Sequence, residues 1–446
     1  MRTPSDNPPP AGRARRRRRA LTVLAVTATL AALGAVAIPL AAQAATPTKV
    51  SIRNDGPATF WTGTVSSTGP TIPNPNIPQC QTVNCDKVEL KVNLPARTWD
   101  RAGGVQVAIR WNGATEGALG LFVVRDNQLV AKSTAGVGIA QSVIIPSARN
   151  GSYFVYVSYG VTFGAVDPDP VISYEGLTEV EYKPDVNPLR DLVPDLASLP
   201  QENVTYDNPG TIFGDVAQPG QSCYDSERQE QGAVQCLRFD QVLQNIGAGP
   251  LELRFTRQTG VFQDEDVAQR IYRSDDTFVD LAAGQVEFHG VHGHYHFKGF
   301  AQSELWLLDS DGNLGSGPAA VGDKVSFCVA DTDLIAWGQK GDAAMSYPAP
   351  DCLEPKQVIG TTEIFSYGMS RGWADRYNWF LPDQMIDTDG LPDATYVLFT
   401  TVDPDNKLRE SSEANNCGSV LVTLTDLATD HPHAQVLGAG PACPSA

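Results

Sequence analysis

Histidine is scarce in this chain of 446 residues, which has six in all and none between residues 46 and 182. Basic residues are also in deficit, with 33 lysines and arginines against 51 aspartates and glutamates, a formal net charge of −18. A strongly acidic protein repels nucleic acid and anionic membranes and attracts cationic partners. The composition therefore argues against a nucleic-acid-binding role, although solubility alone would explain it equally well.

Several familiar signatures are missing. The chain has no Cys-x-x-Cys pair, no Cys/His spacing of a zinc finger, and neither a His-Glu-x-x-His nor a His-x-His-x-Asp-His motif. These absences argue against thiolate metal sites and against two common kinds of zinc hydrolase. No long segment has the periodicity of an amphipathic helix. We therefore expect an all-β protein.

The N-terminal segment is typical of an export signal. A run of arginines at 13–19 precedes an apolar stretch from Leu21 to Leu40, and Ala42-Gln43-Ala44 supplies a small-x-small cleavage pattern. We interpret residues 1–45 as a signal peptide, with an uncleaved membrane anchor as the alternative. Cleavage removes seven arginines and one aspartate, which leaves 26 basic and 50 acidic residues and a net charge of −24. We expect a secreted, extracellular protein with no transmembrane segment after cleavage.

Short alternating stretches indicate strands along the rest of the chain. Residues 105–111 and 153–159 alternate between the two faces of a strand, and Asp126-Asn127 joins two further apolar runs. From this spacing we interpret residues 46–182 as an accessory β-sandwich or jelly roll without a catalytic constellation.

The Pro- and Asp-rich residues 183–190 are typical of a linker. Residues 191–446 again consist mostly of strands, and we expect a second sandwich-like domain with long functional loops. The predicted architecture is thus two β-sandwich-like domains.

An even number of cysteines in an exported chain favours disulfides. The chain has eight cysteines, and the connectivity cannot be fixed from sequence alone. Proximity in sequence suggests four pairs: Cys80–Cys85, Cys223–Cys236, Cys328–Cys352 and Cys417–Cys443.

Four of the six histidines lie in the stretch from His289 to His296. If this stretch is a strand, His292, His294 and His296 lie on one face, because residues two apart share a face. Three imidazoles can meet one ion only if the backbone curls, and Gly290 and Gly293 are the expected sites of a bend or bulge. Imidazole suits copper, zinc, iron and nickel. We predict a metal site. His289 is out of phase with the other three histidines, so it either faces away or is brought round by a bulge.

The chain from Asp191 onward resembles the lysyl oxidases, a family of copper- and quinone-dependent amine oxidases. The resemblance rests on five segments that occur in the family's order: Asp191-Leu192-Val193-Pro194-Asp195, His289 to His296, Gly322 to Cys328, Gly368 to Tyr377 with Gln384-x-Ile386-Asp387, and Glu410 to Asn416 with Cys417 and Cys443. Any one segment is a weak signal, whereas the ordered set is specific.

The resemblance implies the site residues. It makes His292, His294 and His296 copper ligands, with His289 near the metal, and it makes Lys324 and Tyr377 the precursors of lysine tyrosylquinone, a cofactor built from the protein's own side chains. The catalytic base is not identified by sequence, although Asp375, Asp383 and Asp387 lie near Tyr377.

The resemblance also implies a calcium site, which draws on five residues: Asp191, Leu192, Glu410, Asn415 and Asn416. Carboxylate and amide oxygens are the donors that calcium prefers. Ser412 stands where the family often has an aspartate, and hairpin-turn chemistry is an alternative explanation for this loop. Val291 replaces a cysteine of animal members, and the accessory sandwich replaces their propeptide or scavenger-receptor domains, so collagen and elastin are doubtful substrates.

We therefore expect an exported, bacterial copper amine oxidase that acts on primary amines, either peptidyl lysine or small alkylamines. Two alternatives remain open from the sequence. One is a zinc hydrolase that uses the three histidines and an activated water. The other is a copper-binding β-protein that has the metal site but no enzymatic activity.

Overall fold

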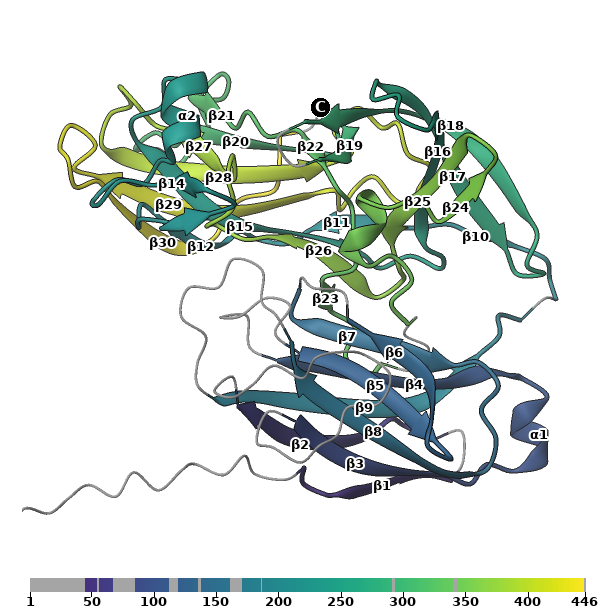
Figure 1. The fold of residues 1–446 in the computed structure, drawn as a ribbon. Coiled ribbons are helices and arrows are strands. Elements are labelled where there is room, and N and C mark those ends of the chain that lie inside the picture. The colour runs from purple at the N-terminus through teal and green to yellow at the C-terminus, as the bar shows by residue number, and fades with distance from the viewer. Residues whose placement is uncertain are drawn as a thin grey trace, which may run out of the picture. The chain divides into compact units, whose positions relative to one another are not determined.

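The computed structural model describes residues 45–53, 56–66, 85–111, 119–134, 138–160, 171–185, 187–290, 293–339 and 344–444. Almost all regular structure in these residues is β-strand (Figure 1), so the predicted all-β class is confirmed. The helical elements are single turns: α1 (Ala96–Trp99), α2 (Asp225–Glu230) and the 3-10 helix η1 (Ala349–Cys352). The signal peptide predicted at residues 1–45 lies almost entirely outside the described residues.

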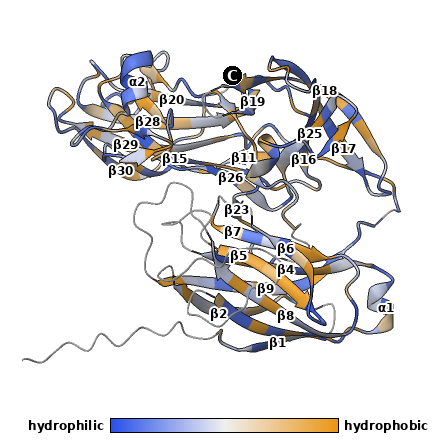
Figure 2. Ribbon diagram, in the orientation of Figure 1, coloured by the Kyte–Doolittle hydropathy of each residue, from blue (hydrophilic) through white to orange (hydrophobic). Residues whose placement is uncertain are grey.

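Two sheets built from residues 49–182 pack against each other. The strands of the first, in spatial order, are β1 (Lys49–Ile52), β3 (Cys85–Val92), β8 (Gly151–Tyr159), β5 (Leu119–Arg125) and β6 (Gln128–Ser133). Those of the second are β2 (Thr59–Ser66), β9 (Val171–Tyr182), β4 (Ala102–Trp111) and β7 (Ala140–Ile145). Side chains from both sheets, such as Val88 and Val107, form one buried core. Figure 2 shows the long apolar stretches of β4 and β5. This arrangement is the expected β-sandwich.

Later residues form three larger sheets. The first contains β22 (Ser326–Phe327), β19 (His294–Lys298), β18 (Phe278–His289), β17 (Glu265–Arg273), β16 (Leu251–Gln258), β25 (Thr362–Met369) and β24 (Gln357–Ile359), with β10 (Asp191–Leu192) paired to β17. The second contains β11 (Leu196–Ser198), β15 (Cys236–Asn245), β26 (Trp373–Tyr377) and β23 (Asp333–Leu334), with β12 (Glu202–Thr205) and β27 (Met385–Asp387) paired to β15. The third contains β21 (Ala320–Val321), β20 (Ala301–Leu307), β28 (Ala394–Val402), β29 (Cys417–Thr425) and β30 (His433–Ala439). A small separate hairpin consists of β13 (Thr211–Ile212) and β14 (Asp215–Val216).

Buried aromatic residues fill the space beside the first and second of these sheets. Tyr295 and Phe255 lie with their ring centroids 4.8 Å apart, and Phe255 stacks on Phe365 at 4.7 Å. The same core includes Trp373 of β26 and Phe327 of β22. Aromatic side chains bury large areas, so this core fixes the positions of the strands that carry the predicted site.

Local sequence signals for turns and disulfides are confirmed. Asp126 and Asn127 connect β5 to β6 with φ of 51° and 61°, the left-handed conformation that a two-residue hairpin turn requires. Three predicted disulfides are present: Cys223–Cys236, Cys328–Cys352 and Cys417–Cys443. The predicted partner of Cys85, Cys80, lies outside the described residues. The domain limits 46–182, 183–190 and 191–446 stay a prediction.

Candidate functional site

A hairpin of β18 and β19 carries the described histidines of the cluster. His289 pairs directly with His294, and Glu287 pairs directly with His296. Residues directly opposite each other in an antiparallel pair project from the same face of a sheet. The side chains of these four residues therefore share one face, while Phe288 and Tyr295 of the opposite face have their rings 5.2 Å apart.

Among the described residues, the strand considered for His292 to His296 is β19, which begins only at His294. Gly293 lies in the turn with φ of 72°, a conformation that favours glycine. Its N–H donates to the carbonyl of His289 at 2.8 Å. The hairpin turn, rather than a bulge, thus brings His289 to the face of His294. His292 lies outside the described residues.

Two imidazoles of this face, those of His294 and His296, are close enough to bind one ion, and the ring of His289 lies beside them. The Nε2 atoms of His294 and His296 are 2.8 Å apart, and the rings of His289 and His296 stack at 5.0 Å. Two nitrogens that each lie about 2.0–2.1 Å from a metal at a right angle are about 2.9 Å apart. The spacing of His294 and His296 therefore fits two ligands of one metal ion. His296 is buried, which excludes much of the solvent from one side of the site.

The loop that carries Lys324 lies next to the histidine strand (Figure 1). Strand β22 pairs with β19 through Phe297 and Phe327, and through Lys298 and Ser326. Lys324 comes two residues before Ser326 in the chain. The predicted lysine is thereby placed at the edge of the sheet that carries the histidines.

Lys324 also lies over the ring of Tyr377, the other predicted precursor. The Nζ atom of Lys324 is 5.2 Å from the centroid of the Tyr377 ring and 5.5 Å from that of Phe327. Phe327 meets Tyr377 edge-on at 4.8 Å. The two side chains that sequence reasoning paired are therefore neighbours, although Lys324 lies in the loop before β22 and Tyr377 ends β26, a strand of another sheet.

The environment of Lys324 favours the neutral amine. Burial lowers the pKa of Lys324 below its ordinary value, and the negative charges of Asp383, Asp375 and Glu227 offset part of this effect. A lower pKa leaves more of the amine unprotonated near neutral pH, and only the unprotonated amine is a nucleophile.

Tyr377 is fixed by contacts on both sides along the chain. Its hydroxyl donates to the carbonyl of Cys328 at 2.9 Å. The preceding residue, Arg376, pairs with three carboxylates, at distances of 2.7 Å from Asp333, 2.8 Å from Glu202 and 3.0 Å from Asp240. Asp240 also accepts the N–H of Trp379 at 2.7 Å. This network holds the backbone on either side of Tyr377, and the bond to Cys328 orients its hydroxyl. Sequence reasoning missed these contacts because they join residues far apart in the chain.

The three aspartates near Tyr377 in sequence differ in position. Asp375 precedes Tyr377 by two residues on β26, so the two side chains share a face, and Asp375 is only 2% exposed. Asp383 has a φ of 62° and donates its N–H to Glu227 at 2.8 Å. Asp387 lies on β27 opposite Cys236. Of these carboxylates, Asp375 and Asp383 are close enough to influence the charge of Lys324.

The sequence of residues 268–430 matches the family model described as lysyl oxidase. This part of the chain is a lysyl oxidase domain. The domain contains the histidine hairpin, Lys324 and Tyr377. The match assigns this region to a lysyl-oxidase-like family of amine oxidases.

Other comparisons add little to the lysyl oxidase assignment. No curated protein matches the chain. A β-glucuronidase structure from Dictyoglomus thermophilum has 9% identity and a TM-score of 0.18, and the match covers 56% of this chain and 49% of that one. The enzyme from Bifidobacterium dentium, complexed with coumarin-3-O-glucuronide, has 10% identity and a TM-score of 0.15, with 76% and 39% covered. The chain thus spans half or less of these proteins, and TM-scores this low carry no argument.

The predicted calcium ligands of the lysyl oxidase resemblance are divided between two clusters. Asp191 pairs with Arg273 at 3.1 Å and with Arg409 at 2.9 Å, and Leu192 pairs with Tyr272 in the sheet. In the second cluster, Asn416 donates to Glu410 at 2.7 Å and to Glu413 at 3.1 Å.

The carboxylate of Glu410 lies within 4.8 Å of those of Asp403 and Glu413. Burial and the charge of Glu413 raise the pKa of Glu410 to about 8. Asn415 donates to Asp195 at 2.8 Å. Asp191 is thus already neutralised by two arginines. The close group of carboxylates contains the predicted Glu410, and Asp403 is a member that the sequence did not single out. Calcium binding stays a prediction.

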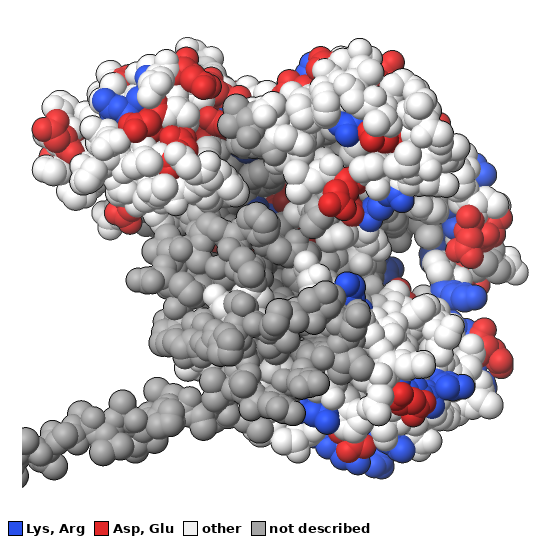
Figure 3. All heavy atoms as spheres, viewed as in Figure 1, with Lys and Arg blue, Asp and Glu red and all other residues white. Residues whose placement is uncertain are grey.

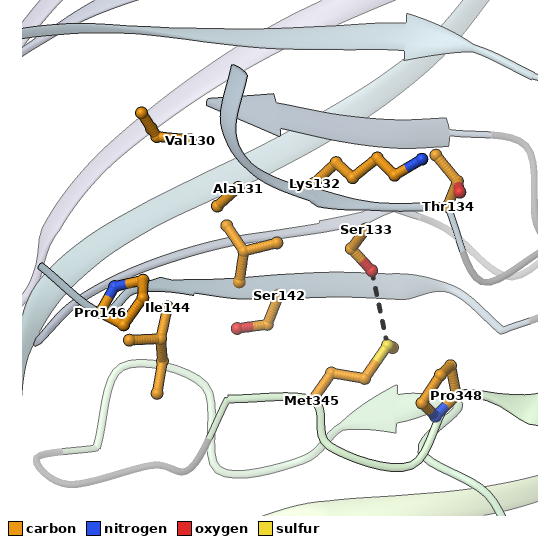
Figure 4. Close-up of a pocket in the computed structure, with 11 residues that line it drawn as sticks. Val130, Ala131, Lys132, Ser133, Thr134, Ser142, Ile144, Pro146, Met345 and Pro348 are labelled. Carbon is orange, nitrogen blue, oxygen red and sulfur yellow. Dashed lines mark hydrogen bonds between the residues drawn. The ribbon is translucent and has the colours of Figure 1, made fainter. Parts of the chain in front are cut away.

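A cavity of about 550 Å³ has no residue of the histidine hairpin in its lining. It is lined by residues of β6 and β7 together with Met345 and Pro348, and Ser133 donates to the sulfur of Met345 at 3.6 Å (Figure 4). The lining contains no histidine, cysteine or carboxylate, so it offers no strong metal ligand. We therefore place the candidate site at the hairpin.

The described surface is acidic in places. On the face shown in Figure 3, aspartate and glutamate side chains gather over the region of α2 and β27.

No helix in the described ranges is long and apolar enough to cross a membrane.

Proposed function

We propose that this protein is an exported copper-dependent amine oxidase. The reaction converts a primary amine, oxygen and water into an aldehyde, ammonia and hydrogen peroxide. The observation that carries the proposal is the distance of 5.2 Å between the Lys324 amine and the Tyr377 ring, beside the sheet that presents the histidines. A lysine held over a tyrosine ring at a metal site is the arrangement that a Lys–Tyr quinone requires.

The histidine face supplies the metal ligands. His294 and His296 are the ligands best supported by spacing, with His292 the third and His289 beside them. When bound, copper and the lysine tyrosylquinone supply the electron transfer that no protein side chain can perform alone. The donor atoms of His294 and His296 are imidazole nitrogens, which suit copper better than calcium or magnesium.

The chain's own residues prepare the two precursors. The Cys328 carbonyl accepts the hydroxyl hydrogen of Tyr377 and so sets the rotation of the phenol about its C–O bond. Burial lowers the pKa of Lys324, which increases the fraction of neutral, nucleophilic amine relative to an ordinary lysine. Asp375 is the best-supported base for the substrate's Cα proton, because it is buried and shares a face of β26 with Tyr377.

The substrate is a primary ammonium ion in solution, either a peptidyl lysine or a small alkylamine. The acidic composition of the chain attracts such cations. Export through the signal at residues 1–45 is consistent with the three disulfides, which persist in oxidising compartments.

The proposal is tested on the purified full chain loaded with copper. Peptide mass mapping should find a cross-linked Lys324–Tyr377 peptide, a redox-cycling quinone stain should be positive, and an amine panel should release peroxide. Separate, unmodified Lys324 and Tyr377 peptides in a fully copper-loaded sample would reject the oxidase. Metal analysis after growth with limited copper and zinc distinguishes it from a zinc hydrolase.

A further inference from the structure

Glu287 lies on the histidine face but is not one of the predicted ligands. It pairs directly with His296 across β18 and β19, so both side chains project from the same face. Ser326 of β22 pairs directly with Lys298 on the other edge of β19. Lys298 follows His296 by two residues, so Ser326 faces the same side as the imidazoles.

A hydrogen bond joins these outer strands across the histidine strand. The hydroxyl of Ser326 donates to a carboxylate oxygen of Glu287. The Nζ atom of Lys298 is 4.0 Å from Glu287 but is held at 2.6 Å by Asp264, its closer partner. Ser326 is therefore the close partner of the Glu287 carboxylate, and the bond ties β22 to β18 next to His296.

Backbone hydrogen bonds also hold the segment that carries Lys324, on both sides of this residue. The N–H of Gly322 donates to the carbonyl of Ser303 at 2.9 Å, and the N–H of Phe300 donates to the carbonyl of Val325 at 2.9 Å. Strand β22 itself has only two residues. Ser326 lies two residues after Lys324, so its bond to Glu287 holds the chain close to the point where Lys324 approaches the Tyr377 ring.

We propose that Glu287 is a positioning residue for formation of the Lys324–Tyr377 cross-link. Through Ser326 it holds the Lys324 segment against the histidine strand, so that the amine meets the ring. The proposal rests on the proposed function, because it assigns Glu287 a part in building the cofactor of that reaction.

Cross-linking needs two molecules of dioxygen: the first converts the Tyr377 phenol to a quinone with release of water, and the second re-oxidises the ring after the Lys324 amine has added, with release of hydrogen peroxide. The test follows cross-linking after copper is added, in air, to the metal-free full chain. The rate of appearance of the cross-linked peptide is measured for wild type, Glu287→Ala, Glu287→Gln, Ser326→Ala and the double variant with both alanines. Copper content and thermal unfolding are recorded for each. Lys298→Met is the matched control, since it removes the other neighbour of Glu287 but leaves the bond to Ser326.

We expect Glu287→Ala and Ser326→Ala each to slow cross-linking about tenfold with full copper content, because a hydrogen bond to a charged group is lost. The double variant should be no slower than either single variant, as expected for two ends of one bond. Glu287→Gln keeps an acceptor and should restore most of the rate. Lys298→Met should behave as wild type.

Other results overturn the inference. Wild-type cross-linking in both alanine variants would show that the bond positions nothing, and additive defects would show that the two residues act separately. Loss of copper in Glu287→Gln would make Glu287 a metal ligand instead. If Glu287→Ala fails to fold, Ser326→Ala, which removes one oxygen atom, decides the matter alone. A copper-loaded wild type that forms no cross-link rejects the oxidase itself, which separates that failure from this one.

Discussion

The amine of Lys324 lies over the ring of Tyr377, 5.2 Å from its centroid, although the two residues are far apart in the chain. We predict that Lys324→Met and Tyr377→Phe each abolish the cross-link. Amine oxidation should fall by at least about 1,000-fold, because the cofactor carries the chemistry. Copper content should stay at the wild-type level, since neither side chain is a predicted ligand. Residual turnover near the wild-type rate in a peroxide assay would contradict the quinone.

The second prediction concerns the metal. His294→Ala or His296→Ala should weaken copper binding by more than about 100-fold. Loss of a residue that only hydrogen-bonds a metal ligand already lowers metal affinity about 10–100-fold, and loss of the ligand itself should lower it further. The exposed His433 of β30 provides a matched control, and His433→Ala should bind copper as wild type does. Competition with a chelator of known affinity measures the change. Equal affinities for all three variants would place the metal elsewhere.

The lowered pKa of Lys324 gives the third prediction. The rate of cross-linking should rise with pH as the amine loses its proton, and the midpoint should lie below the value of about 10.4 for an ordinary lysine. The sign follows from burial, which disfavours the charged form. The measurement is the initial rate of cross-linked peptide formation across a pH series at saturating copper. A midpoint at or above 10.4 would contradict the desolvated amine.

The Cys328–Cys352 disulfide supports the carbonyl that accepts the Tyr377 hydroxyl. Replacement of both cysteines by serine should cost about 3 kcal/mol of unfolding free energy and should also slow cross-linking. The Cys417–Cys443 disulfide closes a loop of similar size, because its sequence separation is 26 and that of Cys328–Cys352 is 24. Its removal should cost a similar stability but leave the yield of cross-link unchanged. Denaturant unfolding and peptide mapping separate the two effects.

The fifth prediction tests the base. Asp375→Asn should still form the cross-link but oxidise amines about 10²–10⁴-fold more slowly, the usual contribution of a general base. Asp387→Asn, on β27, is the control and should retain activity. Titration with a hydrazine reagent counts the quinone independently of turnover. An Asp375→Asn enzyme with full quinone and wild-type kcat would exclude this assignment.

Sequence identified those parts of the fold that local chemistry dictates. Alternating residues located β4 and β8, and Asp126-Asn127 located a hairpin turn, because these signals depend only on neighbours in the chain. The histidine cluster was recognised for the same reason. Among the described residues, His294 and His296 lie on β19, and Gly293, with its positive φ, lies in the turn before that strand.

The rest of the site depends on register and pairing between distant strands. The position of His289 opposite His294, the contact of Lys324 with Tyr377 and the three carboxylates around Arg376 each join segments far apart in the sequence. Local periodicity contains no information on such pairings. Only the resemblance to lysyl oxidases predicted that Lys324 and Tyr377 form a pair. It predicted no role for Glu287.

Lys324 and Tyr377 belong to segments attached to different sheets, since Lys324 precedes β22 and Tyr377 ends β26. A covalent bond between them would tie those sheets together and close a loop of roughly 50 residues, which on loop-entropy grounds is worth about 4 kcal/mol against the unfolded chain. Formation of the cross-link would then also stabilise the folded protein against unfolding. Copper-treated molecules should outlast metal-free ones in a protease, and an enzyme that has once been activated should keep that resistance after its copper is stripped away.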